Sequence, residues 1–455
     1  MVKLRRSAVA LVVLSVLAVA CDKTTRSVAD TTSTPTTPPT PPTSLPSGAT
    51  NAPTSPPTPA PSQKVERPVV EMPPSTETAP LAKGNNTFAF ALYDKVRATP
   101  GNLAISPASI SSALAMTYGG ARGTTADEMK KAMRFTGDPA TVMTGWGKLQ
   151  RALQSPDRPL TLRVANRLFG EKTYAFEKPY LEQTRIAFDA PLEPVDFREG
   201  FEPARVRING WVEEQTEKRI QNLIPARGLT ADTRLVLVNA IYFLADWSQP
   251  FEKFATHDQD FTRAPGAKKK VPMMHQAGSY RYAHTGGVSL LELPYKNEGA
   301  SMLVVLPDRV DGLTDVEASL DGAKLESWRA AMSSQRVEVA LPRFEIDPPA
   351  AIPLAPALMA LGMPTAFDKD KADFTAIGNP ADKRERLHID KVFHKAFVKV
   401  DEKGTEAAAA TAVAMAAGGG MPAKAISFDA DHPFLFVILD RTTNLVLFVG
   451  RVAEP

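Results

Sequence analysis

The stretch EKGTEAAAAT at residues 402–411 decides how this chain folds and acts. It follows the strand-like run FVKV at residues 397–400 without a turn signal, and no proline lies between Pro380 and Pro422 in a chain that contains 40 prolines. A flexible spacer has no reason to exclude proline, whereas a central β-strand does, because proline removes a backbone donor from the ladder. We therefore expect this stretch to become a hydrogen-bonded strand at some stage.

The side chains of the stretch alternate with the period of two that is typical of a strand. One face is uncharged and mostly small, with Thr405, Ala407, Ala409, Thr411, Val413 and Met415. The other face carries Glu406, Ala408, Ala410, Ala412 and Ala414. Because alanine is a poor strand former, nothing local holds the segment extended beforehand. We expect an exposed loop that can later slide into an existing sheet with its small face toward a packed core.

The composition argues against several classes of function. The chain has 53 basic and 50 acidic residues and no basic stripe with interleaved aromatic residues, so nucleic acid is not an expected partner. None of its histidines stands in an H-E-x-x-H motif, and no G-x-S-x-G motif occurs. These histidines are His257, His275, His284, His388, His394 and His432. We expect no enzymatic activity, no cofactor and no metal site.

The N-terminus has the pattern of an export signal. Lys3, Arg5 and Arg6 precede an apolar run at residues 8–20, which predicts a signal peptide over residues 1–20. The small residues before Cys21 are similar to a bacterial lipobox, which would make Cys21 the lipidated first residue of the mature protein. The alternative is an ordinary signal peptide followed by a coincidental cysteine. The lipobox predicts an exported lipoprotein of the cell envelope, held at a membrane and facing the periplasm or the cell exterior.

Residues 21–83 are expected to comprise the lipidated cysteine and a disordered linker. Residues 31–62 are almost wholly Thr, Pro, Ser, Ala and Gly. Such a segment cannot bury enough apolar surface to offset its ordering entropy. The sequence therefore predicts one folded domain over residues 84–455.

This domain is expected to be α+β, because helical patterns come first and strands follow. A helix is predicted to start at Ser106-Pro107 and to end at Gly119-Gly120, and a capping box, TADE at residues 125–128, to open another. Strands are predicted at residues 235–244, 303–306, 337–341, 434–439 and 445–449. The last two are expected to form a hairpin. With one cysteine, no intramolecular disulfide can form, so the core alone must stabilise the fold.

The domain resembles the serpins, a family of serine protease inhibitors. The resemblance is carried by the hinge-like stretch and by motifs that occur in the family's order. These are NLAISPASI at 102–110, LVNAIYF at 237–243, VPMM at 271–274, LELPY at 291–295, LGM at 361–363 and HPFLFVI at 432–438. The resemblance implies a monomer with three β-sheets, eight or nine helices and an exposed reactive-centre loop. The proline-rich residues 347–356 depart from the family pattern, so their local conformation is expected to differ.

In this family, a target protease cleaves the loop and forms an acyl-enzyme, and the cleaved loop then inserts into the main sheet before deacylation. The resemblance thus implies a suicide-substrate inhibitor of serine proteases. A non-inhibitory serpin acting as a surface binding or chaperone protein is the alternative, although such members usually have a bulky, charged or proline-interrupted hinge. A surface-anchored adhesion module would account for the lipobox and the linker but would leave the hinge unexplained.

The resemblance also assigns roles to individual residues. The hinge comprises Glu402, Gly404, Thr405, Glu406, Ala407, Ala408, Ala409 and Ala410. Gly404 would let the backbone bend, and Thr405 would be the first side chain to enter the sheet. The residues similar to the sheet-opening cluster are Ser106, Ser109, Asn209, His394 and, where insertion begins, Trp247. Ordinary buried polar groups and a packing tryptophan are the alternative interpretation of this set.

The target protease is constrained by the loop sequence. Counting from Glu402 as in the family places the cleaved bond between Gly418 and Gly419, with Ala417-Gly418 as the second choice. No Arg or Lys lies between Thr405 and Met421, so a trypsin-like target is not expected. The small residues favour an elastase-like or subtilisin-like serine protease.

Overall fold

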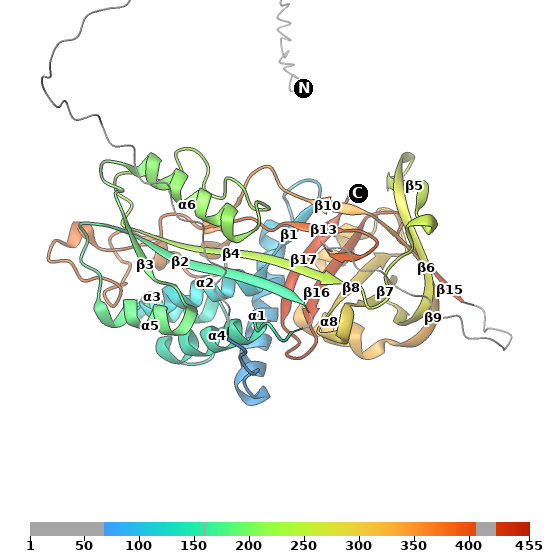
Figure 1. Ribbon diagram of the computed structural model, residues 1–455, viewed down its shortest axis with the longest axis horizontal. Coiled ribbons are helices and arrows are strands. Elements are labelled where there is room, and N and C mark those ends of the chain that lie inside the picture. The colour runs from blue at the N-terminus through green and yellow to red at the C-terminus, as the bar shows by residue number, and fades with distance from the viewer. Residues whose placement is uncertain (1–67, 159, 406–424) are drawn as a thin grey trace, which may run out of the picture. The chain divides into compact units, whose positions relative to one another are not determined.

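The structure is a computed structural model that describes residues 68–158, 160–405 and 425–455 (Figure 1). The predicted signal peptide, Cys21, most of the linker, the hinge residues from Glu406 onward and the predicted cleavage sites at Ala417, Gly418 and Gly419 lie outside these residues. The helices are α1 (Ser75–Val96), α2 (Pro107–Gly119), α3 (Gly123–Ala132), α4 (Pro139–Leu153), α5 (Lys178–Phe188), α6 (Phe201–Gln215), α7 (Leu313–Ala318), α8 (Gly322–Ala331) and α9 (Ala355–Ala360).

A six-stranded sheet contains Gly404 and Thr405 of the hinge and runs in the order β10-β13-β14-β4-β2-β3. Its strands are β2 (Thr161–Glu171), β3 (Leu192–Val195), β4 (Leu235–Asp246), β10 (Phe344–Ile346), β13 (Val398–Val400) and β14 (Gly404–Thr405). The apolar run predicted as a strand at residues 235–244 is confirmed as most of β4. One edge of β4 pairs with antiparallel β2 from Leu244 down to Leu235.

A nine-stranded sheet follows the path β1-β17-β16-β8-β7-β6-β9-β15, and β5 pairs with β6. Its strands are β1 (Leu103–Ile105), β5 (His257–Ala264), β6 (Ala267–Thr285), β7 (Val288–Pro294), β8 (Ala300–Pro307), β9 (Ser333–Pro342), β15 (Ile426–Asp429), β16 (Phe434–Asp440) and β17 (Val446–Val452). The predicted hairpin is confirmed as antiparallel β16 and β17. Short strands β11 (Ile352–Pro353) and β12 (Phe393–His394) form a further pair. The α+β class is therefore confirmed.

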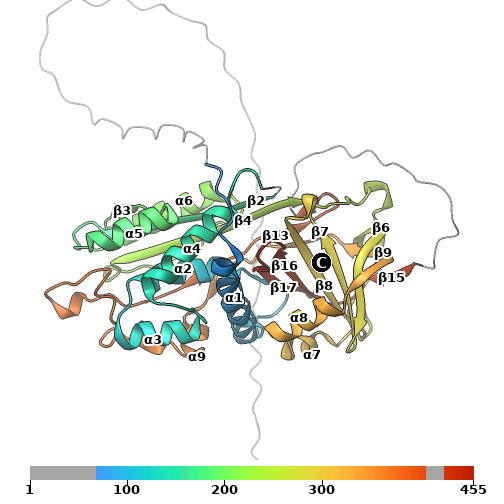
Figure 2. The ribbon, with the colours of Figure 1, turned by 90° about the horizontal axis from the view of Figure 1, so that it is seen from below.

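The helices surround the six-stranded sheet on both faces. Figure 1 shows α6 on one side of β2 and β4, and α2, α4 and α5 on the other. Figure 2 places β6 to β9 at the opposite end from α2 to α5. α2 is buried on nearly every side, since Ala113 is its one residue that is not buried. The core that includes α2 therefore supports the sheet from below, directly under β4.

The structure corrects two local expectations. α1 begins at Ser75 and so extends into the range assigned to the linker. The TADE stretch does not cap α3, which begins earlier at Gly123. Thr125 Oγ1 instead accepts a hydrogen bond of 2.9 Å from the Asp373 backbone, and Glu128 accepts hydrogen bonds of 2.8 Å from Thr365. Distant partners thus occupy the side chains that the sequence assigned to a cap.

A buried ionic network ties the last strand to the rest of the core. Arg451 of β17 donates to Glu317 of α7 at 3.0 Å, and the Tyr93 hydroxyl donates to the same carboxylate at 2.6 Å. Arg451 also donates to the backbone oxygens of Arg97 and Gly101 at 2.8 Å. The Arg451 and Glu317 side chains are only 9% and 5% exposed, so each charge depends on the other for stabilisation.

We expect Glu317→Gln to lower the free energy of unfolding by about 3 kcal/mol, because Arg451 would remain buried without its counter-charge. The matched control is Glu182→Gln, which removes a carboxylate from an exposed pair with Arg185 and should cause no measurable change. Urea unfolding of the two variants and the wild type measures both effects. Equal midpoints for all three proteins would contradict the network's role.

Candidate functional site

Two residues of the hinge, Gly404 and Thr405, lie in the six-stranded sheet. Gly404 and Thr405 form β14, in which Thr405 lies opposite Val400 of β13 on one side and Ala245 of β4 on the other. A Cβ atom at Gly404 would lie 2.1 Å from the Ala245 carbonyl oxygen, so glycine is needed for this close approach. The expectation that the segment is wholly exposed before insertion is therefore wrong for Gly404 and Thr405, which are buried.

Thr405 is anchored by a tyrosine that sequence reasoning did not single out. The Thr405 and Tyr295 hydroxyls share a hydrogen bond of 2.6 Å, and the two residues are 1% and 0% exposed. The Tyr295 ring stacks on Trp247 with centroids 4.5 Å apart and meets Phe243 edge-on at 5.3 Å. Burial raises the pKa of the Tyr295 hydroxyl well above its ordinary value, so it remains a neutral hydrogen-bonding group.

Trp247 lies beside the start of the hinge, and its predicted role where insertion begins stays a prediction. It comes directly after β4 and is 2% exposed. Its backbone N–H donates to the Lys403 carbonyl at 2.7 Å, and its indole Nε1 donates to the Asp401 carbonyl at 3.0 Å. Trp247 thus holds the backbone on both sides of Glu402.

Glu402 fixes the chain immediately before the hinge glycine. Its carboxylate is 3% exposed and accepts hydrogen bonds from Arg343 Nε at 2.7 Å and Thr256 Oγ1 at 2.6 Å. Burial acts to raise the pKa of Glu402, but the bonds from Arg343 and Thr256 outweigh it, so this pKa lies below its ordinary value. The Glu402 carbonyl also accepts from the Phe251 backbone at 2.8 Å. Neither Arg343 nor Thr256 carries a local sequence signal for this role.

The structure brings together three residues of the predicted sheet-opening cluster. His394 Nε2 accepts a hydrogen bond of 3.0 Å from the Ser106 backbone. Ser106 Oγ donates to the Leu447 carbonyl at 2.7 Å and accepts from the Ser109 backbone at 3.3 Å, which caps α2. Burial lowers the pKa of His394 to about 4, so the ring is neutral at pH 7. These bonds link the start of α2 to His394 of β12 and to Leu447 of β17.

Asn209 has a different set of partners. Its amide group donates to the Ile224 carbonyl and accepts from the Ile224 backbone N–H, both at 2.9 Å. The residue thereby holds α6 to the segment that precedes β4. Its role in sheet opening stays a prediction. Asn209 could act on the sheet only through α6, which lies on the opposite face from α2 (Figure 1).

A cavity of about 1130 Å³ opens beside the N-terminal half of β4. Residues 235–238 of β4 line one side, residues 392–394 line the other, and Ser109, Ile110 and Leu114 of α2 contribute to its lining. We call this cavity the slot. In the described part of the chain, the edge of β4 that faces away from β2 pairs with another strand only at Ala245 and Asp246, in β14. The hinge thus fills one end of this strand position, and the slot lies beside the other end.

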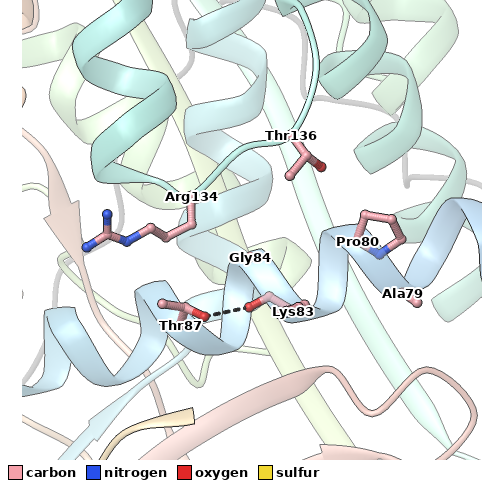
Figure 3. A pocket seen from close by; sticks show the side chains of 7 residues that line it. All are labelled: Ala79, Pro80, Lys83, Gly84, Thr87, Arg134 and Thr136. Carbon is pink, nitrogen blue, oxygen red and sulfur yellow. Dashed lines mark hydrogen bonds between the residues drawn. The ribbon is translucent and has the colours of Figure 1, made fainter. Parts of the chain in front are cut away.

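A second cavity, of about 490 Å³, lies against α1 (Figure 3). Its lining residues are Ala79, Pro80, Lys83, Gly84, Thr87, Arg134 and Thr136. Thr87 Oγ1 is bonded to the Lys83 carbonyl at 2.9 Å, and the Arg134 side chain extends away from Pro80 and Thr136 (Figure 3). None of these residues lines the slot, and we assign this cavity no role.

Residues 68–158, 160–405 and 425–455 contain neither a metal-binding cluster nor a helix that could cross a membrane. No group of three or more His, Cys, Asp or Glu side chains in these ranges is placed to bind a metal ion. Over the same ranges, no helix has the length together with the apolar character that crossing a bilayer requires.

Comparison with known proteins gives a consistent result. A family model described as Serpin (serine protease inhibitor) matches residues 83–455. An uncharacterized serpin-like protein of Thermococcus kodakarensis is 40% identical over 378 residues, which cover 83% of this chain and 86% of that protein. Leukocyte elastase inhibitor of Equus caballus is 38% identical over 385 residues, covering 82% and 99%. The crystal structure of human thyroxine-binding globulin with its ligand matches with a TM-score of 0.75 and 29% identity, covering 83% and 99%.

The neutral state of His394 predicts acid sensitivity. Its pKa is about 4 in the folded protein and about 6.5 when unfolded, so the unfolded state binds the proton more readily. The contribution of neutral His394 to the free energy of unfolding is complete above pH 6.5 and is lost as the pH falls from 6.5 toward 4. At pH 5 the expected loss is on the order of 2 kcal/mol. Urea unfolding of His394→Gln at pH 7 and pH 5 should show a smaller pH dependence than the wild type.

His284→Gln is the matched control, since this histidine is exposed and bonded to Asp308 at the surface. It should retain the pH dependence of the wild type. If His394→Gln also retains it, other groups control the acid sensitivity.

Proposed function

Since the chain belongs to the serpin family, we propose that it inhibits serine proteases by trapping them as they cleave the segment 406–424. The family comprises protease inhibitors and non-enzymatic binding proteins, and the chain is not an enzyme. The observation that carries the proposal is the strand position between β13 and β4, which β14 fills at one end only. A loop that starts in this position needs only to continue along β4 to become a central strand.

The register of β14 supports this path. Gly404 lies opposite Asp246 and Thr405 opposite Ala245, in antiparallel pairing. Continued residue by residue, this register would set Ala407 opposite Phe243 and Met415 opposite Leu235, the first residue of the 12-residue strand β4. In this register, the nine uncharged residues from Ala407 to Met415 would span the edge of β4 from Phe243 to Leu235.

The faces of the segment agree with the same register. Thr405 points into the main core, where it meets Tyr295. With a period of two, the uncharged residues from Ala407 to Met415 would point the same way. Glu406 would point to the opposite face, beside Leu244, which is only partly buried. Insertion would thus bury small apolar groups and keep the one charge out of the core.

In the proposed mechanism, the protease serine attacks the carbonyl carbon of the residue before the cleaved bond. The peptide bond breaks, the new amino terminus leaves with the β15 side of the loop, and an ester joins the protease to the other side. The released segment then inserts along β4 and carries the protease with it before the ester is hydrolysed. Strand pairing and burial supply the free energy, so the uncleaved state persists because of a barrier.

We propose the bond between Gly418 and Gly419 as the cleavage site, with Ala417-Gly418 as the second choice. The small residues around it suit an elastase-like or subtilisin-like protease. The similarity to leukocyte elastase inhibitor supports this class of target.

The alternative is a binding protein that does not inhibit. The similarity to thyroxine-binding globulin and the volume of the slot favour this second function. The two functions differ in one measurable property, because only a trapping inhibitor forms a covalent complex with a protease that survives denaturation by SDS.

We also propose that Cys21 is lipidated and holds the protein at a membrane of the cell envelope. The basic residues Lys3, Arg5 and Arg6, the apolar run and the small residues before Cys21 support this location. Two or three acyl chains would anchor the protein firmly, since each buried methylene contributes about 0.8 kcal/mol. The proline-rich segment after Cys21 would give the inhibitor domain reach around its anchor.

Ala407→Arg should convert the protein from an inhibitor into a substrate. The arginine would enter the core beside Phe243, where an unpaired charge is costly to bury, so insertion should slow while cleavage continues. Glu406→Arg is the matched control, because this neighbouring side chain would face away from the core. The measurement is SDS gel electrophoresis after incubation with subtilisin or elastase. We expect covalent complex with the wild type and Glu406→Arg, and cleaved inhibitor with Ala407→Arg.

Complex formation by Ala407→Arg at the wild-type yield would refute the proposed register. A wild type that is cleaved within residues 412–421 without any complex would favour the binding protein. In that case the cleaved and intact proteins should melt at the same temperature, whereas loop insertion should raise the melting temperature after cleavage.

Cys21→Ser should abolish lipid anchoring and leave unprocessed or soluble protein whose purified domain still inhibits. Fractionation of cells and mass spectrometry of the mature N-terminal peptide measure this outcome. Wild-type protein that is soluble, with an unmodified Cys21 or a different N-terminus, would refute the anchor and leave the inhibitory proposal untouched.

A further inference from the structure

We propose that the Tyr295 hydroxyl holds the hinge inside the sheet before cleavage and thereby raises the fraction of cleavage events that end in trapping. Tyr295 is a positioning residue in this proposal, since it contacts the hinge and not the protease. The effect on trapping rests on the proposed function, whereas the effect on the hinge does not.

The position of the Tyr295 hydroxyl is fixed by its surroundings. Tyr295 comes directly after β7 and is fully buried. Its backbone N–H donates to the Ala300 carbonyl at 3.0 Å, and the residue forms a β-bridge with Trp247. Its ring lies parallel to the Trp247 indole, with 7° between the planes. The hydroxyl is therefore aimed at one place, which Thr405 Oγ1 occupies at 2.6 Å.

The hydrogen bond matters because Thr405 is 1% exposed. A buried hydroxyl without a partner is unfavourable relative to the same group in water. Without the Tyr295 hydroxyl, the buried Thr405 hydroxyl would lose this hydrogen-bond partner. The position of Thr405 inside the sheet would then be less stable relative to a position outside it. Glu402 remains clamped by Arg343 and Thr256, so only the two or three residues after it would have to move.

A seated hinge shortens the conformational step that follows acylation. Insertion competes with hydrolysis of the ester, and each residue that must be ordered first carries an entropic cost. When Gly404 and Thr405 are already paired with β4, insertion extends an existing strand. When they are displaced, the strand must first be started again, so more ester is hydrolysed and more inhibitor is released as cleaved substrate.

Limited trypsin digestion tests the hinge itself, without reference to inhibition. Lys403 precedes Gly404, and its carbonyl is bonded to Trp247 in the seated hinge. Tyr295→Phe keeps the stacked ring and removes the hydroxyl, so cleavage after Lys403 should become about five- to tenfold faster. Tyr180→Phe is the matched control, because it removes another buried tyrosine hydroxyl, bonded to the Met116 carbonyl at 3.2 Å. The rate for the control should equal that of the wild type.

The stoichiometry of inhibition tests the consequence. Tyr295→Phe and Thr405→Val should each raise, about two- to fivefold, the number of inhibitor molecules consumed per subtilisin molecule trapped. The rate of acylation by subtilisin should stay at the wild-type value. A general loss of stability would not predict this combination of an unchanged acylation rate and a raised stoichiometry. Because both variants remove the same hydrogen bond, the double variant should be no worse than either single variant.

Equal trypsin rates for Tyr295→Phe and the wild type would overturn the proposal, and so would additive effects in the double variant. If the wild type forms no covalent complex with subtilisin or elastase, the proposed inhibitory function fails. The trypsin rates would still decide whether Tyr295 holds the hinge.

Discussion

The proposed function depends on the edge of β4 that faces β13. β2 pairs with the other edge from Leu235 to Leu244, whereas the edge toward β13 meets another strand, within the described residues, only at Ala245 and Asp246. Backbone donors and acceptors inside a protein are nearly always paired, so a central strand with an open edge is a source of free energy. The hinge, the slot and the polar cluster all lie along this edge.

The residues that pack below the open edge of β4 are α2 and a cluster of hydrogen-bonded polar side chains. α2 lies under this edge as a buried helix whose first turn is capped by Ser106, and the same serine donates a hydrogen bond to the Leu447 carbonyl of β17. His394 is bonded to the Ser106 backbone as a neutral acceptor. Hydrogen bonds of this kind can be exchanged in place, whereas an apolar interface would have to open a void if the strands separated. The role of this polar cluster in opening the sheet stays a prediction.

The sequence predicted those features that depend on local periodicity and capping. The apolar run of β4, the β16–β17 hairpin and the capping of α2 by Ser106 follow from neighbours within a few residues. The capping box at Thr125 failed because its partner Asp373 lies 248 positions away. Tyr295 and Thr405 are 110 positions apart, and Arg343 and Glu402 are 59 apart. No local pattern encodes these pairs, since they exist only after the chain has folded.

The composition of the loop answers two opposing demands. The proposed strand position lies beside large aromatic residues, since Phe243 contacts both Tyr295 and Phe448. A side chain inserted opposite Phe243 must therefore be small, because overpacking of a dense core is destabilising. Alanine meets this requirement, and its weak strand propensity also disfavours premature extension of β14 beyond Thr405. The hinge can then be seated at Tyr295 while the rest of the strand position stays available, which separates the start of insertion from its completion.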